Sequence, residues 1–443
     1  MEQITKPHCG ARLDRLPDCR WHSSMFAIVA FGLLVCWSNA VGGLILAQLK
    51  ALGWTDNSTT ATFSAITTAG MFLGALVGGI IGDKTGRRNA FILYEAIHIA
   101  CRFVMGVGLG ALLVTLFAGF TEYMPGRNRG TWSSRVSFIG NWSYPLCSLI
   151  AMGLTPLISA EWNWRVQLLI PAILSLIATA LAWRYFPESP RWLESRGRYQ
   201  EAEKVMRSIE EGVIRQTGKP LPPVVIADDG KAPQAVPYSA LLTGVLLKRV
   251  ILGSCVLIAM NVVQYTLINW LPTIFMTQGI NLKDSIVLNT MSMFGAPFGI
   301  FIAMLVMDKI PRKTMGVGLL ILIAVLGYIY SLQTSMLLIT LIGFFLITFV
   351  YMYVCYASAV YVPEIWPTEA KLRGSGLANA VGRISGIAAP YAVAVLLSSY
   401  GVTGVFILLG AVSIVVAIAI ATIGIETKGV SVESLSIDAV ANK

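Results

Sequence analysis

The sequence predicts an all-α membrane protein built from two related bundles of helices. Three observations lead to this fold class: a strongly apolar composition, eleven apolar stretches long enough to cross a bilayer, and a pair of motifs that occurs twice in the same order. Apolar residues make up 56% of the 443 residues and charged residues 13%, whereas about a quarter of an ordinary globular domain is charged. A soluble chain of this length would lack the polar residues needed to cover its surface, and a bilayer removes that requirement.

A helix needs about 20 mostly apolar residues to cross the hydrocarbon core of a membrane. In the first half of the chain, the stretches that reach this length are 25–48, 62–81, 103–121, 134–159 and 164–186. In the second half they are 250–276, 285–307, 315–332, 336–361, 376–398 and 402–424. A shorter apolar stretch, from Asn89 to Ala100, lies between the second and third of them.

Lysine and arginine concentrate in alternate gaps between these stretches. The basic gaps contain Lys84, Arg87, Arg88, Arg127, Arg129, Lys309, Arg312, Lys313, Lys371 and Arg373. The N-terminal tail and the stretch after Arg184 are also basic. Because cytoplasmic loops are enriched in these residues, we predict a multi-pass protein of the inner membrane with both termini in the cytoplasm. The net charge of +10 then reflects orientation in the lipid bilayer, and no nucleic-acid partner is expected.

One long polar segment divides the chain. It contains an amphipathic stretch over 198–217, followed by a linker rich in proline and glycine. The predicted division is an N-terminal transmembrane bundle over 1–186, a cytoplasmic central loop over 187–248, and a C-terminal transmembrane bundle with a short cytoplasmic tail over 249–443. We expect the protein to be a monomer.

Two short motifs occur once in each half. Gly82–Arg88 follows the second predicted span, and Met307–Lys313 follows the second span after the central loop. Further on, Glu122 precedes Arg129 and Gly130, just as Glu364 precedes Arg373 and Gly374. Such a parallel repeat is typical of two similar helical bundles around a central cavity.

The repeat also reveals a difference in length between the halves. Asp83 and Glu122 are 39 positions apart, whereas Asp308 and Glu364 are 56 apart, so the first half is 17 residues shorter here. The corresponding part of the second half contains two full spans. Between Arg88 and Glu122 there is no room for two helices of about 20 residues each. We therefore predict that the third span, near residues 90–100, is truncated.

The motifs resemble those of a known family. Asp83–Arg88 is similar to the signature loop of the major facilitator superfamily, and Pro187–Leu193 reads PESPRWL, a motif of its sugar porter branch. Glu426–Gly429 resembles the PETKG motif of that branch, with Ile425 in place of proline. The chain as a whole resembles inner-membrane metabolite transporters of enteric bacteria. The resemblance implies a fold of two six-helix bundles and transport by alternating access. It also implies that the protein is a transporter and not an enzyme.

Charged residues of these loops form a candidate gate. A carboxylate next to arginines at the membrane surface can form bonds in one transport state and break them in the other. The candidate gating or latch residues are Asp83, Arg87, Arg88, Glu122, Arg129, Glu188, Arg191, Asp308, Glu364 and Arg373. The alternative is that they only anchor the loops on the cytoplasmic side.

Polar residues within the spans are the candidates for binding substrate, because polar groups inside a membrane are costly and often functional. The candidate substrate-binding residues are Ser38, Asn39, Arg102, Asn141, Trp142, Asn261, Gln264, Tyr265, Asn269 and Arg383. Amides, hydroxyls and aromatic faces suit a polyol. Asn261, Gln264 and Tyr265 would share one helix face, although any of them could instead bond to a neighbouring helix. Trp270 is either part of this cluster or an anchor at the membrane interface.

Two departures from sugar porters bear on the substrate. Arg102 matches an arginine that pairs with an acidic residue in proton-coupled members, but the acidic position is Ser38 here. The glutamine pair of hexose transporters is Ala259 and Met260. An arginine without its carboxylate favours an anion such as a sugar acid, unless Glu95 neutralises it.

The sequence thus predicts secondary active or facilitative transport of a small polar metabolite, sugar-like or a sugar acid or other organic anion. Protons are an optional coupling ion. The alternatives are a proton-independent uniporter or exchanger, and a nutrient sensor on a transporter scaffold that transports nothing. Neither cofactor nor metal is expected, since the seven cysteines and three histidines show no ligand spacing.

Overall fold

The computed structural model of the chain describes residues 7–17, 19–36, 41–85, 129–224, 238–307, 309–366 and 370–427. These residues are helical or in loops, and no strand occurs among them. They fall into two compact units. Unit 1 consists of Met1–Ser38, Ala69–Gly140 and Leu169–Lys231, and unit 2 of Asn39–Thr68, Asn141–Leu168 and Ala232–Lys443. The three-part division predicted from the sequence stays a prediction, and the truncated third span near 90–100 lies outside the described residues.

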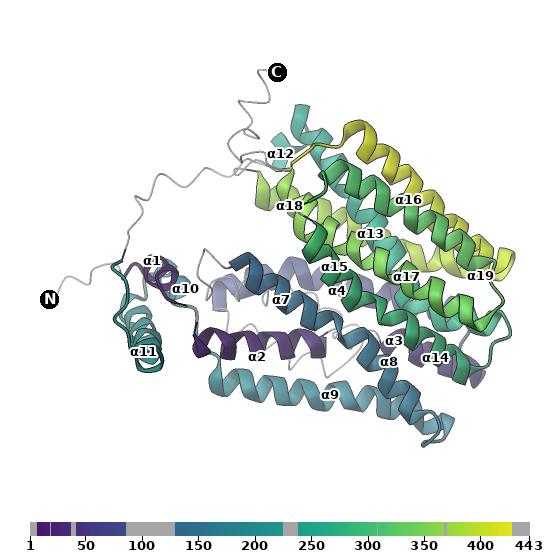
Figure 1. The fold of residues 1–443 in the computed structure, drawn as a ribbon, viewed down its shortest axis with the longest axis horizontal. Helices are drawn as coiled ribbons and strands as arrows, with labels where there is room; N and C mark the ends of the chain where they lie inside the picture. The colour runs from purple at the N-terminus through teal and green to yellow at the C-terminus, as the bar shows by residue number, and fades with distance from the viewer. Residues whose placement is uncertain are drawn as a thin grey trace. The chain divides into compact units, whose positions relative to one another are not determined.

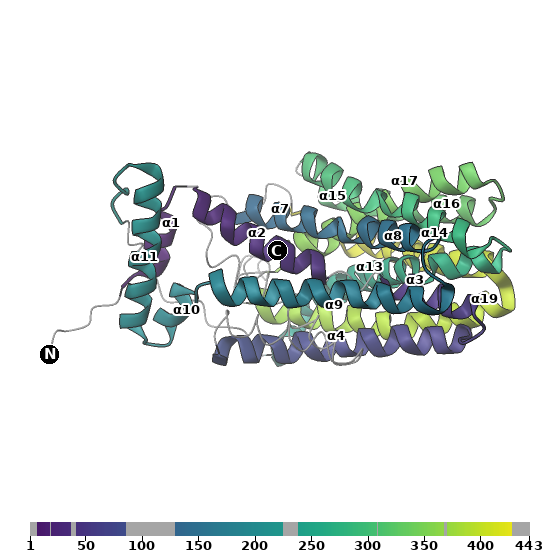
Figure 2. The same cartoon turned by 90° about the horizontal axis from the view of Figure 1, so that it is seen from below.

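Unit 1 contains a small helical group outside the predicted spans. Its helices are α1 (Cys9–Asp14), α10 (Pro190–Ser195) and α11 (Tyr199–Thr217), which lie together in Figures 1 and 2. Ser189 caps α10 by accepting a hydrogen bond from the Trp192 N–H at 3.2 Å, and Gly218 ends α11 in a left-handed conformation. One buried face of α11 carries Ala202, Met206, Ile209 and Val213, as its amphipathic pattern predicts.

Longer helices complete unit 1. They are α2 (Arg20–Cys36), α7 (Arg129–Asn141), and the parts of α4 (Asn57–Thr85) and α9 (Ala160–Tyr185) that follow Thr68 and Leu168. The lipid-facing character of α9 is evident from its large exposed apolar residues. Leu169, Ile173, Leu176 and Trp183 are all exposed along this helix. A helix with such a surface is stable in a bilayer and not in water.

Unit 2 holds most of the chain. Its helices in the second half are α12 (Tyr238–Leu241), α13 (Gly244–Thr277), α14 (Leu282–Met293), α15 (Gly295–Val306), α16 (Arg312–Ser331), α17 (Met336–Cys355), the π-helical turn η3 (Tyr356–Tyr361), α18 (Val362–Glu364) and α19 (Lys371–Ile423). From the first half it includes α3 (Val41–Ala51), α8 (Ser143–Leu154) and the initial parts of α4 and α9. Helices α13, α16, α17 and α19 lie side by side (Figure 1).

The described helices agree with the apolar stretches of the sequence. Six of them are long and apolar enough to cross a membrane, at Glu161–Tyr185, Gly244–Thr277, Leu282–Val306, Arg312–Ser331, Met336–Glu364 and Arg373–Ile423. The last contains two predicted spans, which separate at Gly401, where φ is 64° and the helix geometry breaks. Another predicted span, 285–307, consists of α14 and α15, with a bend at Phe294.

Glycine lets α15 and α17 approach closely. A Cβ atom added at Gly295 would lie 2.4 Å from the Phe344 carbonyl oxygen, and one at Gly299 would lie 2.3 Å from that of Thr348. Neither position has room for a side chain. Small residues at such crossings are the usual means by which membrane helices pack.

Candidate transport pathway

Within unit 2, helices of the first half of the chain pack directly against helices of the second half. Helix α3 contacts α13, and α8 contacts α14. The contact of α3 is backbone to backbone, because a Cβ at Gly43 would lie 2.6 Å from the Ile268 carbonyl oxygen and 2.8 Å from that of Asn269. We call the contact of α3 and α8 with α13 and α14 the seam.

A buried hydrogen bond crosses the seam. The Asn289 side-chain amide on α14 donates to the Ser148 hydroxyl on α8 at 3.0 Å, and both side chains are at most 3% exposed. A second link lies at the loop end, where the Asn57 amide of α4 donates to the Ser398 hydroxyl of α19 at 2.9 Å. Lys50 in turn donates to the Asn57 carbonyl oxygen at 2.7 Å. Polar bonds of this kind add specificity to apolar helix packing.

Aromatic side chains extend the contact between the halves. Trp142 meets Phe294 edge to face with ring centroids 6.2 Å apart, and Tyr144 meets Tyr351 at 5.2 Å. The buried Tyr351 hydroxyl lies close to the Tyr144 and Gln264 side chains. Two hydroxyls and an amide thus gather between α8, α13 and α17.

Several buried polar atoms of unit 2 have no hydrogen-bond partner among the described residues. These unpartnered atoms are the side-chain amide nitrogen and oxygen of Gln48 on α3, the Asn289 side-chain oxygen, the Trp270 indole N–H and the Thr273 hydroxyl. Leaving one such group unpaired costs about 1–3 kcal/mol. Water or a polar solute would satisfy these groups, so the region suits a hydrophilic cargo.

The residues predicted to bind substrate on α13 differ in burial and in their contacts. Asn261 is buried, and its amide donates to the Leu257 carbonyl in its own helix at 2.7 Å. That bond lies within α13 and is not the bond to a neighbouring helix that was the alternative for this residue, so its role in substrate binding stays a prediction. Gln264 and Tyr265 are half-buried, and the Tyr265 ring packs beside Gly386 of α19. Trp270 is fully buried, which excludes its alternative role as an anchor at the membrane interface.

The other candidate substrate-binding residues vary in exposure. Asn141 is buried, Trp142 is 37% exposed, and Asn269 is half-buried. Arg383 is half-buried on α19, with its Nη1 atom buried and without a hydrogen-bond partner in the described part of the chain. Ser38, Asn39 and Arg102 lie outside the described residues. Gln48, Ser148 and Asn289 were missed by the sequence argument, although each is a polar residue within an apolar stretch.

One set of candidate gating residues forms a charged cluster at the ends of α16, α18 and α19. Arg312 is the central cation, and its Nε and Nη2 atoms bond to the two Glu364 oxygens at 3.0 and 3.1 Å. Glu364 also accepts from the Thr427 hydroxyl at 2.6 Å. Glu426 accepts from the backbone N–H groups of Arg312 and Lys313 at 2.8 and 3.1 Å. Glu364 was predicted as a gating residue, whereas the roles of Arg312, Glu426 and Thr427 were not.

The remaining candidate gating residues are only partly described. Arg191 pairs with Asp14 of α1, Nη2 to Oδ1 at 2.7 Å, and Glu188 accepts from the Ser189 N–H at 3.0 Å. Asp83 lies in the last turn of α4 and Arg129 begins α7. Arg373 lies in the first turn of α19. Arg87, Arg88, Glu122 and Asp308 lie outside the described residues.

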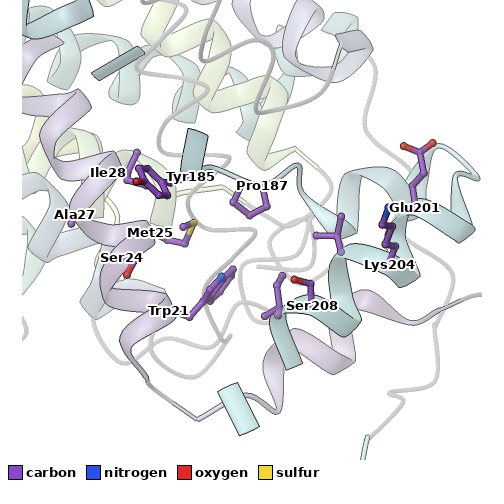
Figure 3. Close-up of a pocket in the computed structure, with 12 residues that line it drawn as sticks. Trp21, Ser24, Met25, Ala27, Ile28, Tyr185, Pro187, Glu201, Lys204 and Ser208 are labelled. Carbon is purple, nitrogen blue, oxygen red and sulfur yellow. The ribbon is translucent and has the colours of Figure 1, made fainter. Parts of the chain in front are cut away.

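Unit 1 contains a separate cavity of about 920 Å³ between the start of α2, the end of α9 and α11 (Figure 3). Trp21, Met25, Tyr185 and Pro187 provide apolar walls, and Lys204 of α11 contributes a cation. No residue of this cavity was predicted from the sequence, because the three lining segments are far apart in the chain.

A bundle of apolar helices with polar groups buried along a seam is compatible with a membrane transporter, and comparisons with known proteins define the class. The profile described as Major Facilitator Superfamily matches residues 94–390. The chain belongs to the major facilitator superfamily.

Named relatives narrow the class to metabolite transport. The metabolite transport protein YdjK of Escherichia coli K12 is 96% identical over 459 aligned positions that cover 100% of both chains. The inner membrane metabolite transport protein YdjE of the same organism is 43% identical and covers 98% of this chain and 99% of its own. Among solved structures, the inward-open xylose transporter XylE of E. coli superposes with a TM-score of 0.73 at 17% identity, covering 94% of this chain and 99% of that one.

These findings confirm the predicted family and helical fold. The chain is a multi-pass membrane transporter of metabolites and is not an enzyme, because its fold and relatives are those of major facilitator transporters.

Proposed function

We propose that this protein moves a small polar metabolite across the inner membrane by alternating access, with both termini in the cytoplasm. The cargo is a sugar-like compound, or a sugar acid or related organic anion. The observation that carries the proposal is the seam of unit 2, where helices of both halves meet around buried polar atoms that have no hydrogen-bond partner among the described residues.

In this proposal the seam closes the pathway on the periplasmic side. The positive-inside pattern assigns the loops at 52–56 and 278–281 to that side, and both adjoin helices of the seam. For solute to enter from the periplasm, α3 and α8 must separate from α13 and α14, and the bond between Ser148 and Asn289 must break. Movement of packed helices between two arrangements is a common form of such a transition.

The Arg312–Glu364 cluster fits the role of a cytoplasmic fixture of the second half. Glu364 accepts hydrogen bonds from the Arg312 side chain and the Thr427 hydroxyl, and Glu426 accepts one from the Arg312 backbone N–H. The cluster therefore holds the ends of α16, α18 and α19 together. Asp83, Arg87, Arg88, Glu122 and Arg129 are proposed to contact this side in one transport state and release it in the other. Asp308, Glu188, Arg191 and Arg373 complete the proposed latch.

We also propose that the third span of this chain is shortened. The alignment with YdjK has 459 positions, 16 more than the 443 residues of this chain. This difference supports the deletion of about one crossing inferred from the repeat. The alternative is that the deletion makes this chain a defective variant.

Transport assays separate the proposed activity from its alternatives. The full chain is reconstituted in proteoliposomes, and uptake of labelled sugars and sugar acids is measured with and without an imposed proton gradient. Uptake that rises with the gradient supports proton symport. Uptake that is indifferent to the gradient supports a uniporter or exchanger, and absence of uptake for all compounds supports the sensor or the defective variant.

A further inference from the structure

We propose that Arg383 binds the carboxylate of the transported solute, so that the substrate is a hydroxylated carboxylate, such as a sugar acid, in place of a neutral sugar. This inference rests on the proposed transport function and specifies its substrate class. It comes from the position of Arg383 in α19, from the absence of acidic residues in α13 and α19, and from the polar side chains of α13 beside the glycines that flank Arg383.

Arg383 lies deep within a span. The first part of α19 extends from Lys371 to the break at Gly401, so Arg383 is 12 residues from one end and 18 from the other. At 1.5 Å per residue these separations are about 18 and 27 Å. A guanidinium stays charged in proteins, and a charge at this depth is costly unless it is paired or faces water.

Neither α19 itself nor α13 supplies a counter-ion for Arg383. Helix α13, which makes the most extensive contact with α19, has no acidic residue from Gly244 to Thr277, and α19 itself has none from Lys371 to Ile423. Nη1 of Arg383 is buried without a hydrogen-bond partner among the described residues. Arg312 provides a contrast, because its guanidinium bonds to both Glu364 oxygens.

The glycines that flank Arg383 in α19 pack against α13. Gly382 packs against Leu257 and Asn261, and Gly386 packs against Tyr265 and Thr68. The half-buried Tyr265 lies beside Gly386, three residues after Arg383, and the half-buried Gln264 precedes Tyr265 in α13. An arginine offers paired donors for a carboxylate, while an amide and a phenol offer hydrogen bonds to hydroxyl groups. Together they suit a molecule with a carboxylate at one end and hydroxyls along its length.

Direct binding tests this inference independently of transport. The purified full chain in detergent is titrated calorimetrically with gluconate, galactonate, glucuronate and galacturonate, each matched with its neutral parent sugar. We expect at least one acid to bind at least ten times more tightly than its parent. Arg383→Gln should weaken binding of that acid at least tenfold. Arg383→Lys should weaken it less, because lysine keeps the positive charge, although it lacks the paired donors of the guanidinium.

Arg165→Gln serves as the matched control, because Arg165 stacks on Trp164 at 4.3 Å, away from α19 in sequence and contact. This variant should bind the acid as the unmodified protein does. Neutral sugars that bind as tightly as their acids would overturn the role of Arg383 and leave the proposed transport intact, as would an Arg383→Gln variant with unchanged acid binding. If no acid and no sugar binds, and none is taken up by proteoliposomes, both the inference and the proposed function fail.

Discussion

Asn289 of α14 donates a hydrogen bond to Ser148 of α8 across 3.0 Å, and 141 positions of sequence separate the two residues. The bond joins the first half of the chain to the second where both side chains are buried. It therefore reports on whether the seam is closed.

Asn289→Ala should open the seam more often. Losing a buried hydrogen bond and leaving the Ser148 hydroxyl unpaired costs about 1–3 kcal/mol, which shifts the equilibrium between closed and open states roughly 5- to 150-fold. Cys147 adjoins Ser148 and is buried, so its labelling by a membrane-impermeant maleimide should accelerate in the variant. Peptide mass spectrometry would measure the labelling.

Ser413→Ala is the control for that experiment. The Ser413 hydroxyl is equally buried but donates only within its own helix, to the Leu409 carbonyl at 2.7 Å. Its loss should leave the labelling of Cys147 unchanged. Equal labelling in the Asn289→Ala variant and the unmodified protein would show that this bond does not hold the seam.

Glu364→Gln should destabilise the protein. The substitution removes one carboxylate charge that faces the buried Arg312 guanidinium and weakens its bidentate bond. We expect a loss of about 2 kcal/mol, seen as a lower thermal unfolding midpoint in detergent. Glu161→Gln, at an exposed position in the first turn of α9, should leave the midpoint unchanged. Equal midpoints for all three proteins would rule out a structural role for the cluster.

The docking of α1 on α11 should depend on pH. Arg12 pairs with Glu203 and with Glu210, the latter at 2.7 Å, and Arg15 pairs with Glu210 at 2.7 Å. Burial raises the pKa of Glu210, but the hydrogen bonds from Arg12 and Arg15 outweigh it, so that the pKa is lowered from its ordinary value. A lowered carboxylate pKa stabilises the docked state above the unfolded pKa of about 4.3. This contribution is lost as the pH falls through the folded pKa.

Cys9 can serve as a probe of the docking of α1 on α11, because its thiol is buried in the core formed by α1, α10 and α11. Burial, followed by the nearby Glu194 carboxylate, raises the pKa of the Cys9 thiol to about 12. Its reaction with dithiodipyridine, which proceeds in acid, should be slow from pH 5 to 8 and accelerate below about pH 4. Glu210→Gln should react at least tenfold faster at pH 7, whereas Glu211→Gln, exposed on the same helix, should not. A Glu210→Gln rate equal to that of the unmodified protein would mean that the apolar core alone holds α1.

Insertion of a 17-residue apolar segment after Ala100 should restore a full third span. If the shortened region limits function, uptake into proteoliposomes should rise several-fold, because the first bundle would then contain as many complete crossings as the second. A 17-residue glycine–serine insert at the same position is the control. No gain from the apolar insert would mean that the short region suffices for whatever transport the chain performs.

The sequence predicted those parts of the fold that depend on local pattern. Apolar stretches marked the described spans, and the break between the last two coincides with Gly401, where the backbone adopts a positive φ. The amphipathic stretch 198–217 matches α11, because its apolar face repeats with helical periodicity. The motif that contains Glu364 drew attention to a residue that does form a charged cluster.

Other features depend on contacts that no local pattern contains. Ser148 and Asn289 are ordinary polar residues in apolar stretches, and only the fold pairs them. Arg312 could have been expected to pair with any of several carboxylates, and its partners Glu364 and Glu426 lie 52 and 114 positions away. Helix α1 has six residues, too few for a periodic signal, and its docking depends on α11.

The most direct test of alternating access through the seam is reversible cross-linking of its two sides. Ser148→Cys and Asn289→Cys are combined, with the native cysteines replaced by serine, and uptake into proteoliposomes is measured before oxidation, after oxidation and after reduction. If the seam must open for transport, the disulfide should abolish uptake and reduction should restore it, while Ser148→Cys alone should be insensitive to oxidation. Uptake that continues at the same rate with the cross-link formed would contradict alternating access through the seam.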